Sequence, residues 1–464
     1  MLFNTTQFFV FLAVVLALFY LSPRRLRKYI LLAASYYFYA SWNAKFIALL
    51  LTLTVIDYVA GIWLERVPPG PRRKAVLIFS LAANLGFLGF FKYYNFLAGN
   101  LALAMGRPAH SFFLQIVLPL GISFHTFQSM SYVIDVYRGM QPAVRNPVDY
   151  ALFICFFPQL VAGPIVRARD FFRDLWGWKQ PSADDVARGV FLISLGLTKK
   201  MAFADQFAQV ANAYFANVAG NPGALAAWSG VFAFALQIYF DFSGYTDMAI
   251  GMAKLLGFHF PINFRRPYLA ASITDFWRRW HISLSSWLRD YLYIPLGGNR
   301  GGHLKTYRNL MLTMLLGGLW HGASWNFLIW GGYQGALLSI ERLLRGEHAV
   351  DEEWNWSYPL RAIVTFVLAC IGWVFFRAAD LKQSIYVVGQ MFHGSAGKLL
   401  LEPWHFELAT LALILAIGEE KREWFERAIR APAPIYACAL TAMLFCLEIF
   451  AVVDAAIPFI YFQF

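Results

Sequence analysis

The segment Asp275-Phe-Trp-Arg-Arg-Trp-His281-Ile-Ser-Leu-Ser-Ser-Trp287 lies in the middle of a chain that otherwise consists largely of apolar runs. A second histidine follows in Gly317-Gly-Leu-Trp-His321-Gly-Ala-Ser-Trp325. Histidines, arginines and glycines thus gather between residues 264 and 329, whereas the sequence on both sides predicts hydrophobic helices. An ionisable residue inside a membrane-embedded region is costly, and it is a functional candidate for that reason.

The composition indicates a membrane protein. Of the 464 residues, 59% are hydrophobic and only 14% are charged, whereas about a quarter of a soluble chain is charged. The apolar runs are continuous rather than alternating, which favours transmembrane helices over a β-barrel. We therefore predict an all-α polytopic membrane protein. No linker rich in serine or glycine divides the chain, so we expect a single domain over residues 1–464.

The apolar runs predict a series of helices with short connections. They cover residues 1–21, 29–39, 46–64, 75–97, 113–136, 150–161, 186–215, 224–256, 325–344, 360–375, 406–417 and 435–453. Residues 158–169 contain two prolines and are too short for a crossing, so we expect a re-entrant hairpin there. The basic segments 24–28 and 66–74 are predicted to be cytoplasmic, as is a charged surface helix over 419–430.

The net charge of +12 has two explanations. Lysines and arginines in cytoplasmic loops would set the orientation of the chain. Alternatively, they would hold a phosphate-bearing ligand, because residues 264–308 contain eight lysines and arginines and only two acidic residues. In this stretch Arg278, Arg279 and Arg289 alternate with tryptophans, which fits either an interfacial anchor helix or a cradle for a phosphorylated cofactor with His281 at its deep end. Nucleic acid is not an expected partner, since no soluble basic domain is present.

The residue types alone leave the role of His321 open. A buried histidine is commonly a hydrogen-bonded core residue that burial keeps neutral. A neutral imidazole in a dry site is also what a general base for acyl transfer must be. Asp241 and Asp247 must face the protein interior, where they either bind neighbouring helices, for example through an arginine, or contact substrate. No spacing of histidines and cysteines supplies three or four metal ligands, so no metal is expected.

Taken together, the motifs resemble the membrane-bound O-acyltransferase family. The resemblance rests on Asp275-Phe-Trp-Arg-Arg-Trp-His281, on Leu288-Arg-Asp-Tyr-Leu-Tyr-Ile-Pro-Leu-Gly-Gly298 and on Gly318-Leu-Trp-His321-Gly322. The segment Phe157-Pro-Gln-Leu-Val-Ala-Gly-Pro-Ile-Val-Arg167 and the opening Leu2-Phe-Asn with Pro23-Arg-Arg-Leu-Arg27 are similar as well. The branch of the family that O-acetylates bacterial polysaccharides is the best match.

The resemblance implies a helical bundle with re-entrant segments around a central tunnel in the bacterial inner membrane. Acetyl-CoA would enter from the cytoplasm, where Arg278, Arg279 and Arg289, with Trp320, would bind it. His321 would be the catalytic base, and His281 would position or polarise the thioester carbonyl.

The resemblance also implies a route for the acetyl group. The tail Phe459-Ile-Tyr461-Phe-Gln-Phe464 resembles the C-terminal motif of a small partner protein in the D-alanylation system. By that analogy Tyr461 would carry the acetyl group and pass it to an extracytoplasmic acetyltransferase that modifies an exported polysaccharide. The simpler alternative is that Tyr461 anchors the last helix at the membrane interface. The competing class of protein is a transporter or flippase for a glycan or lipid-linked intermediate, without acyl chemistry.

Overall fold

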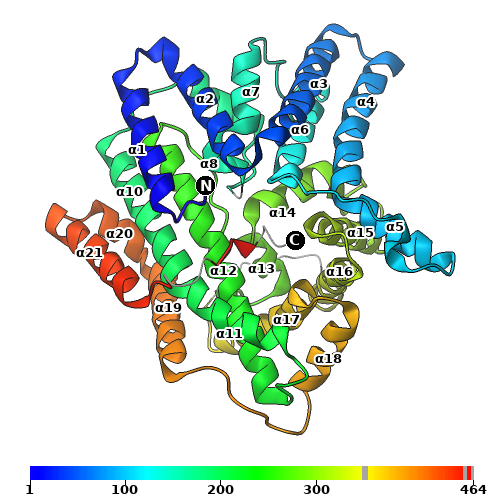
Figure 1. Cartoon of the computed structure of the whole chain (residues 1–464), viewed down its shortest axis with the longest axis vertical. Helices are drawn as coiled ribbons and strands as arrows, with labels where there is room; N and C mark the ends of the chain where they lie inside the picture. Colours follow the sequence, from blue (N-terminus) through cyan, green and yellow to red (C-terminus); the bar gives the residue numbers. More distant parts are fainter. Residues whose placement is uncertain (162, 347–353, 453–456, 461–464) are drawn as a thin grey trace. The chain divides into compact units, whose positions relative to one another are not determined.

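The computed structural model describes residues 1–161, 163–346, 354–452 and 457–460. Within these ranges the chain forms helices and connecting segments and no β-strand (Figure 1), which confirms the all-α class. The residues group into two compact units, 1–190 with 248–261 and 191–247 with 262–464. Two helices, α10 (Ala183–Leu197) and α12 (Ala224–Leu255), continue from one unit into the other. The single domain over residues 1–464 stays a prediction.

The first unit is built around α6, most of whose side chains are buried even though many are polar. In chain order its helices are α1 (Thr6–Leu21), α2 (Arg24–Asn43), η1 (Ala44–Phe46), α3 (Ile47–Arg66), α4 (Pro71–Leu88), η2 (Gly89–Tyr93), α5 (Tyr94–Ala104), η3 (Ala109–Phe112), α6 (Ile122–Tyr137), α7 (Pro147–Cys155), α8 (Phe157–Leu160) and α9 (Ala168–Trp176). Helix α6 packs against α3 and α4, and α2 packs against α1 and α7.

Two predicted helices of this unit are shorter than the apolar runs that predicted them. The run 113–136 becomes helical only at Ile122, because Gly121 adopts a left-handed conformation with φ 71°. A Cβ at Gly121 would lie 2.4 Å from the carbonyl oxygen of Leu160, so only glycine fits there. The run 150–161 breaks after Cys155, close to Pro158. The irregular backbone expected near residues 158–169 is therefore present, and its depth in a membrane stays a prediction.

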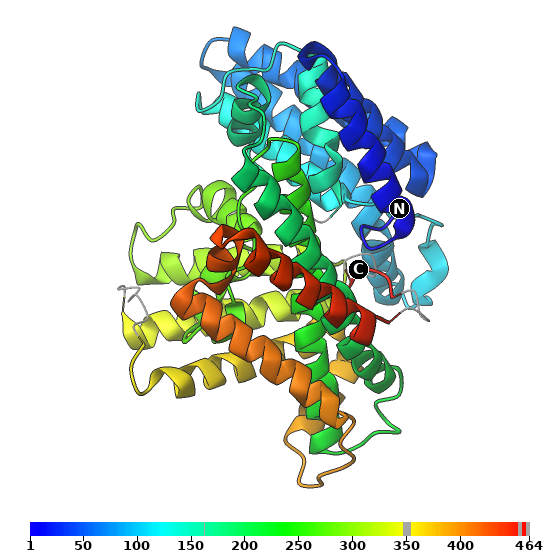
Figure 2. The same ribbon diagram turned by 90° about the vertical axis from the view of Figure 1, so that its left-hand side faces the viewer.

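The second unit contains both histidines of the central stretch. Besides its parts of α10 and α12, it contains η4 (Thr198–Ala204), α11 (Asp205–Ala216), η5 (Pro267–Leu269), α13 (Ile273–Arg279), α14 (Ile282–Leu288), η6 (Arg289–Tyr293), α15 (His303–His321), α16 (Trp325–Arg345), α17 (Tyr358–Arg377), α18 (Leu381–Met391), α19 (Pro403–Arg422), α20 (Trp424–Arg430) and α21 (Ala433–Phe450). Helix α16 packs between α15 and α17, and α21 packs against η4. Figure 2 shows the C-terminal helices α19 to α21 in orange and red.

The charged surface helix predicted over residues 419–430 is wrong in its boundaries. Helix α19 continues through Arg422, and Glu423 then adopts a left-handed conformation with φ 50° before α20 begins. Glu419 and Glu420 therefore belong to the end of α19, and their side chains are only 14% and 13% exposed. They face Arg266 and Arg279 rather than solvent. The sequence suggested a surface helix because it could not show that these two glutamates pair with distant arginines.

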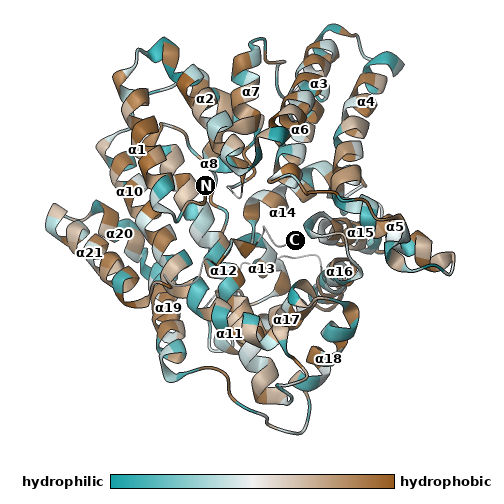
Figure 3. Cartoon of the chain, viewed as in Figure 1, coloured by the Kyte–Doolittle hydropathy of each residue, from teal (hydrophilic) through white to brown (hydrophobic). Residues whose placement is uncertain are grey.

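Among the residues that the structure describes, five helical stretches are long and apolar enough to cross a membrane. They are residues Arg24–Arg66, Pro71–Ala104, Ala224–Leu255, Tyr358–Arg377 and Ala433–Phe450. No side chain of α21 is buried, although the helix is strongly apolar. Figure 3 shows hydrophobic residues along most of α1 and α21. Because water would not tolerate such a surface, lipid is the environment that fits it.

Candidate active site

His281 lies at the junction of two short helices. Ser272 caps α13, and its Oγ accepts a hydrogen bond from the backbone N–H of Asp275 at 3.1 Å. Helix α13 ends at Arg279, and His281 then adopts a left-handed conformation with φ 43° before α14 begins. A residue with a Cβ rarely adopts this conformation, which costs about 1–3 kcal/mol and persists only where the surrounding structure enforces it. The His281 side chain is fully buried.

Asn263 fixes the ring of His281. Its Oδ1 lies 3.1 Å from Nδ1 of His281 and accepts hydrogen bonds from the backbone N–H of Ser283 at 3.2 Å and from the Ser283 hydroxyl at 2.9 Å. Its backbone carbonyl accepts from the N–H of Ile282 at 2.9 Å. Asn263 therefore holds the start of α14 and the imidazole at the same time.

These contacts assign the tautomer of His281. A backbone N–H only donates, so the Asn263 atom that faces Ser283 is the oxygen rather than the nitrogen of the amide. That oxygen only accepts, and Nδ1 of His281 must carry the proton. Nε2 is then the nitrogen with the lone pair. His281 lies outside the candidate membrane-spanning helices, and burial lowers its pKa to about 3, so the ring is neutral near pH 7.

His321 is the last residue of α15 and lies in an aromatic shell. Its ring centroid is 5.0 Å from Trp320, 5.2 Å from Trp330 and 5.1 Å from Phe376, each in an edge-to-face arrangement. These rings come from α15, α16 and α17. The side chain is 6% exposed. His321 is therefore buried, as both interpretations of the sequence require, and its catalytic role stays a prediction.

Glycines allow α15 and α16 to approach closely beside His321. A Cβ at Gly318 would lie 2.2 Å from the carbonyl oxygen of Phe327, and a Cβ at Gly322 would lie 2.1 Å from the ring of Phe327. Neither distance is possible, so these positions require glycine. The glycines thus make room for the backbone and a ring of α16.

Trp320 connects the two histidines. Its ring centroid lies 6.2 Å from that of His281 and 5.0 Å from that of His321. Trp320 is itself buried. The structure therefore brings together three of the site residues predicted from the sequence, around one indole ring.

A buried ionic cluster lies on η4, α11 and α12. Nζ of Lys200 is 2.6 Å from Asp205 and 2.8 Å from Asp241, and all three side chains are at most 4% exposed. Asp241 was expected to face the interior, with an arginine as the suggested partner; its partner is a lysine. The adjacent Lys199 forms a separate pair with Asp247 at 2.6 Å.

The Lys200–Asp241 cluster binds the C-terminal segment. The backbone N–H of Ile460 donates to Asp241 at 2.6 Å, and Lys200 donates to the carbonyl oxygen of Ile457 at 3.2 Å. Between these two contacts lies Phe459, which is buried and stacks on Tyr245 with ring centroids 4.5 Å apart. Tyr461 lies outside the described residues.

Phe242 links this segment to His281. Its ring centroid is 5.9 Å from that of Phe459 and 4.7 Å from that of His281. The segment 457–460 is thus one aromatic ring away from the first histidine. Sequence analysis missed Asn263, Lys200 and Asp205. A signal was present for the lysine, since two consecutive lysines interrupt an apolar run.

The three predicted phosphate-binding arginines differ in their surroundings. Arg279 is bound on both sides, by Asp275 and by Glu420, at 2.8 Å each. Arg289 is 63% exposed and contacts the neighbouring Asp290 at 2.8 Å. Arg278 is exposed at the end of α13. Arg278 and Arg289 are therefore more accessible to a ligand than Arg279.

Comparison with known proteins identifies the family. The model of the membrane-bound O-acyltransferase family matches residues 81–377. This range includes both histidines and the aromatic shell of His321. The chain belongs to the membrane-bound O-acyltransferase family. It is accordingly a multi-pass membrane protein and an acyltransferase, which confirms the resemblance and sets aside the transporter alternative.

Individual relatives narrow the type of acyltransferase. The chain is 47% identical to the probable alginate O-acetylase AlgI of Azotobacter vinelandii over 84% of this chain and 78% of the relative. It is 40% identical to the peptidoglycan O-acetyltransferase of Helicobacter pylori, over 84% of this chain and 80% of the relative. The teichoic acid D-alanyltransferase of Bacillus subtilis is 29% identical over 58% of this chain and 70% of the relative. The protein is a membrane O-acyltransferase of the AlgI and peptidoglycan O-acetyltransferase type.

Proposed function

We propose that this enzyme takes acetyl groups from cytoplasmic acetyl-CoA and moves them across the bacterial inner membrane toward O-acetylation of an exported polysaccharide. The names of the similar alginate and peptidoglycan O-acetylating proteins support the acetyl group and the polymer class. The observation that carries the proposal is the contact of Trp320 with both histidine rings inside a buried aromatic site. A tunnel through the bundle would bring donor and acceptor to that point.

The reaction at this site is an acyl transfer to oxygen. An acceptor hydroxyl attacks the thioester carbonyl carbon while His321 takes its proton. The carbon–sulfur bond then breaks, and the sulfur leaves as a thiol after receiving that proton from His321. The acetyl group ends on the acceptor oxygen as an ester, and free CoA remains on the cytoplasmic side. The dry surroundings of His321 exclude the water that would otherwise hydrolyse the thioester.

The tautomer of His281 favours a positioning role over polarisation of the carbonyl. Nδ1 donates to Asn263, so Nε2 presents a lone pair and accepts hydrogen bonds. A carbonyl oxygen needs a donor, whereas an acceptor hydroxyl needs somewhere to donate. We therefore assign to His281 the orientation of the attacking hydroxyl.

The arginines would bind the phosphates of the donor. Arg278 and Arg289 remain the better candidates, because the guanidinium of Arg279 already has two carboxylate partners. Arg279 would act by fixing α13, which leads into His281. Trp320 would line the path of the acetyl-thioester between the two histidines.

Tyr461 would be the acceptor hydroxyl within the chain. The cluster around Asp241 holds the backbone of Ile460, the residue before it, in the same unit as both histidines. An acetyl ester on Tyr461 would then pass to an extracytoplasmic acetyltransferase, which regenerates the tyrosine. The alternative is that Tyr461 only anchors the chain at the interface.

Mass spectrometry of the C-terminal peptide tests the relay. Purified protein incubated with acetyl-CoA should gain one acetyl group on Tyr461, and the Tyr461→Phe variant should neither gain it nor support polymer acetylation. Tyr436→Phe on α21 is the matched control and should retain both. An unmodified Tyr461 together with full activity of Tyr461→Phe would end the relay proposal.

A further inference from the structure

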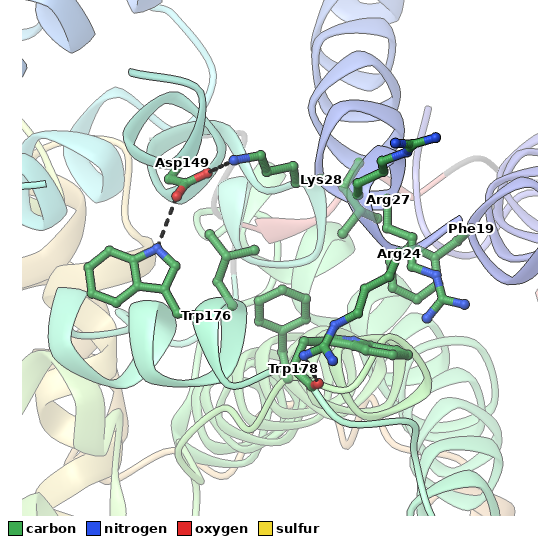
Figure 4. Close-up of a pocket in the computed structure, with 11 residues that line it drawn as sticks. Phe19, Arg24, Arg27, Lys28, Asp149, Trp176 and Trp178 are labelled. Carbon is green, nitrogen blue, oxygen red and sulfur yellow. Dashed lines mark hydrogen bonds and ion pairs between the residues drawn. The ribbon is translucent and has the colours of Figure 1, made fainter. Parts of the chain in front are cut away.

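A basic pocket of about 160 Å³ lies at the start of α2 in the first unit (Figure 4). Four cationic residues line it, together with one carboxylate and several apolar rings. The cations are Arg24, Arg25, Arg27 and Lys28, and the carboxylate is Asp149. The active site described above uses none of these residues.

The carboxylate neutralises only one of the four cations. Oδ1 of Asp149 lies 2.7 Å from Nζ of Lys28, and Oδ2 accepts a hydrogen bond from Nε1 of Trp176 at 2.9 Å. Both oxygens of Asp149 are therefore engaged. Among the described residues, the arginines of the pocket form no ion pair with a carboxylate.

Two of these arginines are held in place by neutral groups. Arg24 donates to the backbone carbonyl of Trp178, and Nε of Arg27 donates to the carbonyl of Ser22 at 3.3 Å. The guanidinium of Arg27 also lies over the Trp178 ring, 4.4 Å from its centroid. Nε1 of Trp178 in turn donates to the carbonyl of Leu256 at 2.8 Å. The positive charges of Arg24 and Arg27 are thus held in position by uncharged groups.

The position of the pocket in the chain indicates that it lies at the depth of the lipid headgroups. Helix α1 ends at Leu21, and the arginines begin α2 three residues later, where a chain that leaves a membrane and turns back meets the lipid headgroups. Tryptophans favour the same depth. Phe19 and Leu31 add apolar surface to the lining, as a glycerol backbone and the start of acyl chains require.

We propose that this pocket binds a phosphate group, supplied by the headgroup of an anionic phospholipid of the cytoplasmic leaflet. Guanidinium groups recognise phosphate oxygens through paired N–H donors, and basic pockets between membrane helices on the cytoplasmic side bind anionic headgroups. The net excess of three positive charges calls for an anion, and the aromatic and aliphatic lining favours a lipid over a soluble phosphate. The site is independent of the acyl-transfer proposal.

Lipid binding to the full-length purified protein tests the site. Delipidated protein is transferred into nanodiscs of phosphatidylcholine with a rising fraction of phosphatidylglycerol, and the bound anionic lipid is counted by native mass spectrometry. The double variant Arg24→Gln/Arg27→Gln should retain phosphatidylglycerol roughly 10- to 100-fold more weakly than the unmodified protein. The control Arg72→Gln/Lys74→Gln removes the same charge at the start of α4, where both residues are exposed and outside the pocket, and should bind as the unmodified protein does.

Two further measurements test the need for positive charge at Arg27 and distinguish a lipid headgroup from a soluble phosphate. Arg27→Lys keeps the charge and should retain most of the binding, and an unchanged thermal midpoint of the double variant would show that its loss of binding does not come from misfolding. Inorganic phosphate and glycerol 3-phosphate, each added alone, should compete only weakly if a lipid is the source; strong competition by either, lost in the double variant, would assign the same site to a soluble phosphate. Equal phosphatidylglycerol retention by Arg24→Gln/Arg27→Gln and the unmodified protein would overturn the proposal, as would an equal loss in the control.

Discussion

Asp241→Ala should release the C-terminal segment while leaving the rest of the unit folded. The substitution removes the oxygen that accepts from Ile460, and it leaves Lys200 with Asp205 as a balanced buried pair. Removal of Lys200 would be a poorer experiment, because it would leave two carboxylates buried without their cation.

The size of the effect follows from the contact. A hydrogen bond to an ionised group contributes about 1.5–3 kcal/mol, and an equilibrium changes tenfold for every 1.4 kcal/mol. The docked state of segment 457–460 should therefore be destabilised roughly 10- to 150-fold relative to the released state. Lys200 still donates to the carbonyl oxygen of Ile457, so the segment should not be lost completely.

Hydrogen exchange of the Ile460 amide measures this release directly. Asp247→Ala is the matched control, since it removes the same group from the same helix and leaves Lys199 without its partner, yet Asp247 has no contact with the segment among the described residues. Exchange at Ile460 should accelerate in Asp241→Ala and stay unchanged in Asp247→Ala, with amides of α16 protected in both. Equal exchange at Ile460 in the two variants would refute the anchoring role of the cluster.

Three further changes test separate parts of the structure. Asn263→Ala should lower the turnover number about 100-fold with little change in the KM for acetyl-CoA, because His281 loses its orientation; an unchanged turnover number would contradict this. Gly331→Ala should lower the free energy of unfolding by about 1–3 kcal/mol, because its Cβ would lie 2.3 Å from a backbone carbonyl oxygen. Gly332→Ala should be nearly neutral, because the atom nearest to its Cβ is 3.5 Å away. Equal thermal midpoints of the two variants would contradict this packing. Burial opposes ionisation of Glu420, but two neighbouring guanidiniums outweigh it and lower the pKa of this carboxyl below 4.5. The ionised carboxylate therefore stabilises the fold above pH 4.5, and this stabilisation is lost as the pH falls through the lowered pKa. In unfolding measurements, the difference in stability between the unmodified protein and Glu420→Gln should shrink over that range.

The helices and the burial of His321 within an apolar run follow from local sequence, which explains why both were predictable. A continuous apolar run specifies a membrane helix by itself, and the glycines beside His321 indicate close packing wherever their partner lies. Boundaries were less predictable. The left-handed residues Gly121 and Glu423 end or delay helices inside runs whose composition is otherwise uniform.

Two polar contacts of the site were not predictable, because each joins residues far apart in the chain. Lys200 meets Asp241 across two helices, and Arg279 meets Glu420, 141 residues later. When the partner of an arginine is unknown, an arginine next to a histidine motif fits a phosphate-binding role as well as it fits an ion pair. Asn263 escaped prediction because a single asparagine in a non-helical segment has no periodic pattern to mark it.

We propose that His321 is the base in acetyl transfer from acetyl-CoA. The most direct measurement is transfer of radiolabelled acetyl from CoA by the purified protein and its His321→Ala variant, with His405→Ala as a control that removes another buried histidine from the same unit. Transfer should be lost in His321→Ala and retained in His405→Ala, while both variants keep the thermal midpoint of a folded protein. Normal transfer by a folded His321→Ala variant would contradict it.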